Sequence, residues 1–161
     1  MHAAMERSLL FVCLLALAAC GDDEAKPYIT FDGGGFIFNY RHAEVYYGFN
    51  VRPLRRLDKG TVLEAEFENP AGGKAFIERQ TVLIERLRYS FRTPSLTGVV
   101  KDRDYKVEVR VLDKDSKVVL ARYPHAFRSQ LDQSANPDKA PFVGPVYTPN
   151  PELDPNAPKK P

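Results

Sequence analysis

Residues 28–128 alternate apolar and polar side chains again and again, and this period of two constrains the fold more than any other feature of the sequence. Residues 105–111, YKVEVRV, put one tyrosine and three valines on one side and charged residues on the other. Residues 62–68 (VLEAEFE) and 86–92 (RLRYSFR) alternate in the same way. Because successive side chains of a strand point to opposite faces, strict alternation is typical of a strand with one buried face. The apolar side chains expected to face the core in these stretches are Leu63, Ala65, Phe67, Leu87, Tyr89, Phe91, Tyr105, Val107, Val109 and Val111.

Three further stretches, which begin at residues 36, 44 and 117, are rich in the β-branched and aromatic residues that favour strands. Turn-forming residues separate the stretches, notably the glycines at 33–35 and the sequence NPAGG at 69–73. The sequence DKDS at 113–116 is typical of a hairpin loop. The pattern therefore predicts an all-β fold, a single antiparallel β-sandwich of about seven or eight strands over residues 28–128.

One part of this region resembles a known motif. Residues 99–109, VVKDRDYKVEV, are similar to the tyrosine corner of fibronectin type III and immunoglobulin-like domains, in which a tyrosine opens the second-last strand and an apolar residue lies six positions before it. Val99 and Tyr105 have this spacing. The resemblance covers residues 87–128 and implies a sandwich of that kind, with the tyrosine hydroxyl bonded to upstream backbone. The core tryptophan common in such domains is absent. The alternative is that Tyr105 is simply a half-buried aromatic residue of a strand.

The N-terminal segment is apolar but short. Residues 8–19, SLLFVCLLALAA, follow Arg7, and Met5 is an alternative start to Met1. A membrane-spanning helix needs about 20 apolar residues. The run has instead the length of the hydrophobic region of a signal peptide.

The end of this run is similar to a bacterial lipobox. Leu17-Ala18-Ala19-Cys20 places small residues directly before a cysteine. The resemblance implies cleavage after Ala19, a diacylated sulfur on Cys20 and further acylation of the new amine. Residues 1–19 are then a lipoprotein signal peptide. The alternative is an ordinary secretory signal followed by an incidental cysteine.

These features predict a location in the bacterial cell envelope, with the polar chain after Cys20 facing the periplasm. In enteric bacteria an Asp directly after the lipidated cysteine marks retention in the inner membrane, but Gly21 holds that position here. The outer membrane is therefore favoured. Residues 20–27 are expected to be a flexible tether between the lipid and the folded domain.

Cysteine usage and charge exclude several classes of function. The two cysteines are Cys13, in the segment to be removed, and Cys20. The mature domain therefore has no disulfide, no thiolate metal ligand and no cysteine nucleophile. The formal net charge of +2 is too small to predict nucleic-acid binding.

The composition changes after Arg128. Residues 129–161 hold eight of the 13 prolines and few large apolar residues, which favours an extended or disordered tail. Two interpretations are open for this tail. It is either a solvated spacer or a docking segment built on residues 141–147, PFVGPVY.

The candidate partner-binding site lies in residues 46–60, where aromatic residues precede a basic run. Adjacent tyrosines point to opposite faces of a strand, and Tyr and Arg are enriched at protein interfaces. The alternative is a core strand followed by a solvated basic loop. The candidate residues are Tyr46, Tyr47, Phe49, Arg52, Arg55 and Arg56.

Catalytic and metal-binding patterns are incomplete. His42 and Glu44 have the H-x-E spacing of zinc deaminases, but the P-C-x-x-C partner is missing. The acidic row Glu64, Glu66 and Glu68 is expected to be a solvated strand face. The sequence thus predicts no enzyme, cofactor or metal, and favours a lipid-anchored, non-catalytic module that binds another envelope protein or polymer. The alternative is an envelope hydrolase or metal-handling protein that uses His42, Glu44 and His125.

Overall fold

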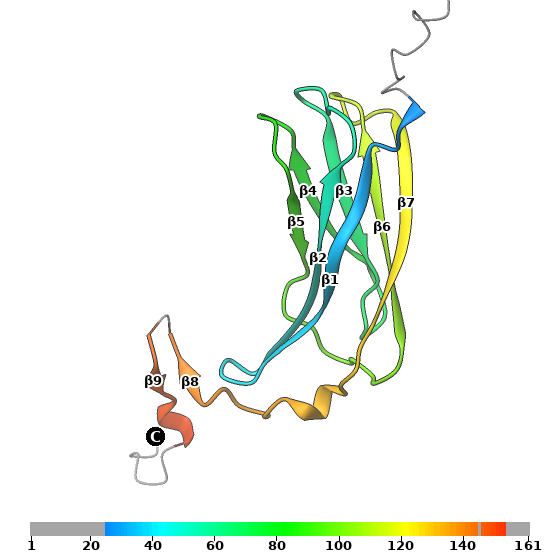
Figure 1. Cartoon of the computed structure of the whole chain (residues 1–161). Helices are drawn as coiled ribbons and strands as arrows, with labels where there is room; N and C mark the ends of the chain where they lie inside the picture. Colours follow the sequence, from blue (N-terminus) through cyan, green and yellow to red (C-terminus); the bar gives the residue numbers. More distant parts are fainter. Residues whose placement is uncertain (1–24, 145, 154–161) are drawn as a thin grey trace, which may run out of the picture.

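The structure, a computed structural model, describes residues 25–144 and 146–153. Seven strands of this part of the chain form two antiparallel sheets (Figure 1). One sheet has three strands in the order β1-β2-β5, and the other has four in the order β4-β3-β6-β7. The all-β fold with antiparallel sheets is confirmed. The strands are β1 (Ile29–Asn39), β2 (Glu44–Pro53), β3 (Val62–Phe67), β4 (Phe76–Thr81), β5 (Tyr89–Arg92), β6 (Asp104–Leu112) and β7 (Val119–Arg128).

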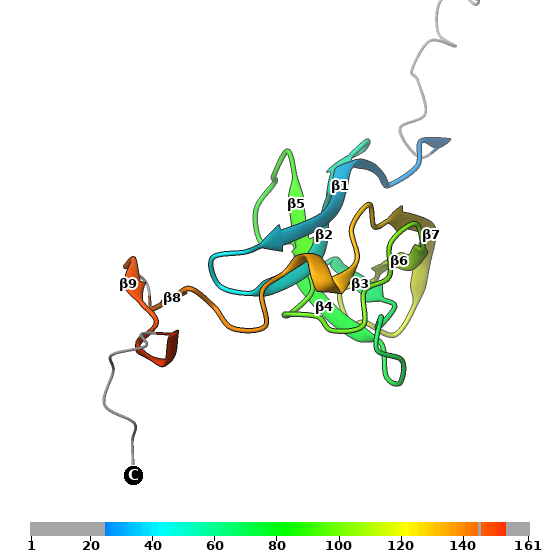
Figure 2. The same ribbon diagram turned by 90° about the horizontal axis from the view of Figure 1, so that it is seen from below.

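The hydrophobic core lies between the two sheets, which Figure 2 shows as two facing layers. Alternate residues of β2, β3, β5 and β6 point into it, as the period-two pattern predicts. On β6 every second residue from Tyr105 to Val111 is buried, and on β3 Leu63, Ala65 and Phe67 are fully buried. The central strand β2 contributes Val45, Tyr47, Phe49 and Val51.

Leu87 departs from the prediction, because its side chain is 88% exposed and β5 begins only at Tyr89. The register between β2 and β5 explains the late start. Tyr89 pairs with Val51, so an extension of β5 would set Arg88 opposite Arg52 and Leu87 opposite Pro53. Like charges directly opposite each other destabilise a sheet, and proline has no N–H for the ladder. Residues 82–88 therefore form a loop.

Tyr105 is fully buried at the start of β6, so the interpretation as a half-buried strand residue is wrong. Its hydroxyl accepts a hydrogen bond of 2.8 Å from the backbone N–H of Val100, five residues upstream. Val99 is buried beside this turn. The tyrosine thus fixes the loop before β6 onto the end of the strand.

The chain after β7 packs against the loop that precedes β6. Two backbone hydrogen bonds hold Ser129 against the loop before β6, and its side chain is buried. The segment then contains two short 3-10 helices and a two-stranded hairpin, and Arg41 lies over the ring of Tyr147. These elements are η3 (Gln133–Ala135), β8 (Phe142–Val143), β9 (Thr148–Pro149) and η4 (Pro151–Leu153). In the described ranges, no helix is long and apolar enough to cross a membrane.

The loops gather at two opposite ends of the sheets (Figure 1). The upper end holds residues 25–28 and the loops 54–61, 82–88 and 113–118. The lower end holds the loops 40–43, 68–75 and 93–103 and the chain after β7. The described chain therefore enters the domain at one end and leaves it at the other.

Candidate functional site

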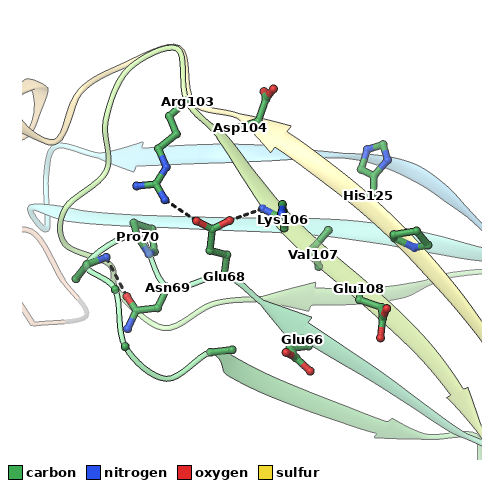
Figure 3. A pocket seen from close by; sticks show the side chains of 15 residues that line it. Glu66, Glu68, Asn69, Pro70, Arg103, Asp104, Lys106, Val107, Glu108 and His125 are labelled. Carbon is green, nitrogen blue, oxygen red and sulfur yellow. Dashed lines mark hydrogen bonds and ion pairs between the residues drawn. The ribbon is translucent and has the colours of Figure 1, made fainter.

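An open groove of about 1130 Å³ lies on the outer face of the four-stranded sheet. The last residues of β3, the first residues of β6 and the middle of β7 form its floor, and the loop 69–75 forms one wall (Figure 3). The charged and titratable side chains that line it are Glu66, Glu68, Arg103, Asp104, Lys106, Glu108 and His125.

The wall of the groove is a glycine-rich turn. The side-chain oxygen of Asn69 accepts a hydrogen bond from the N–H of Ala71, and its backbone oxygen accepts one from Gly72. Gly72 and Gly73 both have φ of 82°, a conformation that other residues adopt only with strain. The sequence NPAGG therefore supplies a compact, small-residue edge that leaves the groove open.

Each of the four carboxylates that line the groove forms an ion pair with a different arginine. The nitrogen–oxygen distances are between 2.5 and 2.7 Å. Glu68 also accepts a hydrogen bond from the backbone N–H of Lys106 (Figure 3). The hydrogen bond from Arg128 holds the pKa of Asp104 below its usual range. The pairs are Glu66–Arg110, Glu68–Arg103, Asp104–Arg128 and Glu108–Arg122.

This pairing restricts the chemistry of the groove. A general acid needs a carboxyl group that keeps its proton near neutral pH, and the lowered pKa of Asp104 makes this carboxyl group unsuited to that role. His125, at the edge of the groove, stacks on the ring of Phe31 with centroids 4.4 Å apart. The arrangement is suited to presenting fixed charges and hydrogen-bonding groups to a bound molecule.

Glu64 corrects the expectation that its face of β3 is solvated, because its side chain is only 5% exposed. It lies between Arg79 of β4, at 2.5 Å, and Arg110 of β6, at 2.8 Å. Both arginines are its direct cross-strand partners in the sheet register. The sequence alternation did not reveal this burial, because it does not show which strands flank β3.

Glu64→Gln is expected to lower the free energy of unfolding by about 1.5–3 kcal/mol, because the nearly buried side chain loses its charge and with it the charge-assisted hydrogen bonds to Arg79 and Arg110. Glu66→Gln is the matched control. The Glu66 side chain is 41% exposed, and it shares Arg110, so we expect a loss below about 1 kcal/mol. Urea unfolding monitored by circular dichroism measures both. Equal losses would contradict the structural difference between the two carboxylates.

The predicted partner-binding residues do not form one surface. Tyr47 and Phe49 lie in the core, whereas Tyr46 is half-buried on the other face of β2 with Arg92 over its ring. The Tyr47 hydroxyl donates a hydrogen bond of 2.9 Å to the backbone oxygen of Glu68. Burial, and then the charge of Glu68, raise the pKa of the Tyr47 phenol. The structure matches the alternative interpretation, a core strand followed by a basic loop.

The arginines of the candidate site lie at the upper end, away from the groove. Arg52 and Arg56 are exposed, and the guanidinium of Arg55 lies 3.5 Å from the ring centre of Tyr28. Cys20 and the rest of the lipobox lie outside the described residues.

The three residues of the alternative hydrolase or metal hypothesis are not brought together. His42 belongs to the turn between β1 and β2 and borders a small pocket with Phe142 and Tyr147. Glu44 begins β2 and is exposed, whereas His125 lies on β7 beside the groove. Within residues 25–144 and 146–153, no three or more His, Cys, Asp or Glu side chains are placed to hold a metal ion.

The sequence analysis did not predict the groove, for the same reason that it did not predict the burial of Glu64: both depend on which strands are neighbours. Its residues come from β3, β6, β7 and a loop, and only the strand order brings them together. The sequence signal that did exist was NPAGG at 69–73, which predicts a turn but not what the turn borders.

Comparison with known proteins gives only weak structural matches. No protein-family model matches the chain, and no curated protein matches it. Among solved structures, the chain is similar to OgpA from Akkermansia muciniphila, in the P 41 21 2 crystal form, with a TM-score of 0.37 and 11% sequence identity. That match covers 65% of this chain and 29% of the OgpA chain. A second crystal form of OgpA gives a TM-score of 0.36, again with 11% identity, and covers 65% and 27% of the two chains.

Proposed function

We propose that the protein is a lipid-anchored lipoprotein of the bacterial cell envelope that acts as a non-catalytic binding or scaffolding module. The lipobox Leu17-Ala18-Ala19-Cys20 supports the anchor. The groove supports binding in place of catalysis, because it is open while its carboxylates are each paired with an arginine. This pairing is the observation that carries the proposal.

The domain that the lipid holds is proposed to be a fibronectin type III or immunoglobulin-like sandwich. Two observations support this assignment. The first is the division into sheets β1-β2-β5 and β4-β3-β6-β7, with every pairing antiparallel. The second is the hydroxyl of Tyr105, which binds the upstream backbone at Val100 at the start of the second-last strand of the larger sheet.

The location follows from the anchor. Gly21 after the lipidated cysteine favours the outer membrane, with the domain facing the periplasm. The partner is then another envelope protein or polymer. It would cross the end of the four-stranded sheet and meet the fixed charges of Glu68, Arg103 and Asp104.

A single bulky substitution in the groove tests the binding function. Pro124 is exposed on the edge strand β7 and lines the groove, so Pro124→Tyr is expected to reduce recovery of a partner from detergent-solubilised envelope at least about tenfold, a loss of roughly 1.4 kcal/mol. The control is Thr81→Tyr, at an exposed position on the other edge strand, β4, outside the groove.

The comparison is made with the full chain after chemical cross-linking in intact cells. If both tyrosine variants recover a partner as well as the native chain does, the groove is excluded as the binding site of that partner. Absence of any cross-linked species from the native chain would contradict the proposed function itself.

A further inference from the structure

We propose that the upper end of the domain lies flat on an anionic lipid bilayer, with the loop 82–88 inserted at the boundary between headgroups and acyl chains. The inference rests on the proposed lipid anchor at Cys20 and adds a second contact to it, made by the folded domain. Four observations carry it: the tether length, the apolar loop, the charge of this end, and the continuity of its surface.

The tether is short. Tyr28 is eight positions after Cys20, and a chain extends at most about 3.6 Å per residue, so the backbone of Tyr28 lies within about 29 Å of the backbone of Cys20. β1 begins directly afterwards, at Ile29, at the upper end (Figure 1). The eleven residues of β1 then span about 36 Å at roughly 3.3 Å per residue. An anchored chain therefore keeps the upper end close to the bilayer and the lower end away from it.

The loop 82–88, VLIERLR, exposes three large apolar side chains within five residues. Leu83 is 65% exposed, Ile84 is 66% exposed and Leu87 is 88% exposed. Val118, in another loop of the same end, is 55% exposed. Apolar side chains that enter a bilayer interface are stabilised by the removal of their surface from water, as acyl chains are.

The charge of this end suits an anionic surface. Residues 25–28 and the loops 54–61, 82–88 and 113–118 contain eight Lys and Arg residues against four Asp and Glu residues. The corresponding loops of the lower end, with residues 129–144 and 146–153, contain five of each. One acid of the upper end, Asp113, already accepts hydrogen bonds from two backbone N–H groups of its own loop. Basic residues near a membrane surface are attracted to anionic lipids.

The loops of the upper end form one continuous surface. Val82 exchanges two backbone hydrogen bonds of 2.8 Å with the loop 54–61, through Gly60 and Thr61. The other end of that loop is bound to the residue that follows the tether, because the backbone N–H of Leu54 donates a hydrogen bond to the backbone oxygen of Tyr28. The apolar loop and the chain that leads to the lipid are therefore linked through one stretch of basic loop. A bilayer in contact with one of them lies close to the other.

A tryptophan reporter tests the contact, since the chain contains no tryptophan of its own. Leu87→Trp places the probe at the proposed membrane contact. Val100→Trp is the control, because Val100 is 48% exposed at the lower end. The full chain is isolated from the envelope and mixed with vesicles of phosphatidylglycerol and phosphatidylethanolamine, with and without brominated acyl chains. We expect blue-shifted emission and loss of most of the fluorescence to bromine for Leu87→Trp, and neither change for Val100→Trp.

The outcomes separate this inference from the anchor. Mass spectrometry of the N-terminal peptide reports acylation of Cys20 independently of the tryptophan signal. Unquenched Leu87→Trp on an acylated chain, or equal quenching of the two probes, would overturn the membrane contact and leave the anchor standing. If the peptide carries no lipid, the proposed anchor fails, and quenching of Leu87→Trp alone would still support the basic, apolar end as a membrane surface. Equal quenching in vesicles of phosphatidylcholine alone would overturn the role of anionic lipid.

Discussion

Cys20→Ser is expected to abolish incorporation of labelled palmitate and to leave either uncleaved precursor or mislocalised chain. The hydroxyl oxygen of serine does not replace the cysteine sulfur as the acyl acceptor, so no lipid forms. The loss of label should be close to complete, because under the proposed anchor every acyl chain depends on modification at Cys20. Labelling of cells followed by immunoprecipitation measures the loss.

Cys13→Ser is the matched control, because this cysteine lies in the segment that the lipobox implies is removed. It should leave palmitate labelling unchanged. The circular dichroism of both variants should match that of the native chain, since Cys20 precedes the first strand by nine residues. Label that persists in Cys20→Ser would show that the acyl group is attached elsewhere.

Tyr47→Ala is expected to lower the free energy of unfolding by about 3–5 kcal/mol, as for other aromatic residues cut back to alanine in a core. The Tyr47 side chain is fully buried and stacks on Phe36 at a centroid distance of 4.8 Å. Its ring also meets Phe67 edge-on at 5.2 Å. The substitution removes these contacts and leaves the backbone oxygen of Glu68 without the tyrosine hydroxyl. Urea unfolding followed by far-UV circular dichroism measures the loss.

Two variants make this result specific. Tyr46→Ala removes the same side chain one position earlier, where it is half-buried on the outer face, and should cost less than about 1.5 kcal/mol. Tyr47→Phe keeps the ring and removes only the hydroxyl, so about 1 kcal/mol is expected. If Tyr46→Ala were as destabilising as Tyr47→Ala, the assignment of the two tyrosines to opposite faces of β2 would be incorrect.

The tyrosine pair also shows how far the sequence alone leads. Alternation predicted that Tyr46 and Tyr47 point to opposite faces, and it predicted the buried faces of β3 and β6, because one buried face per strand is a local property of the chain. The alternation failed at Leu87, because the residue at which β5 begins depends on Pro53 and Arg52 of the neighbouring strand β2. Strand pairing involves two segments of the chain, so the sequence of one segment alone does not determine where its strand begins.

The candidate site was beyond sequence reasoning for the same physical reason. The run around Tyr47 contains the residue types of an interface, but aromatic side chains are equally suited to a core, and only the second sheet decides between the two. The groove depends on ion pairs across strands, such as Glu108 with Arg122, whose partners are 14 residues apart. Its charges were visible in the sequence, whereas the arginine that pairs with each carboxylate was not.

The entry of the chain at one end of the sheets and its exit at the other has a mechanical consequence. A force applied between the N-terminal anchor and the chain after β7 would act on the beginning of β1 and on the end of β7. It would be directed along the axes of these strands. β1 is paired with β2 over residues 29–39, and β7 with β6 over residues 119–128. Their ladder hydrogen bonds lie across the direction of pulling, so they are loaded together in shear and are not broken one at a time. The fold is thus oriented to resist a pull applied between the beginning of β1 and the end of β7.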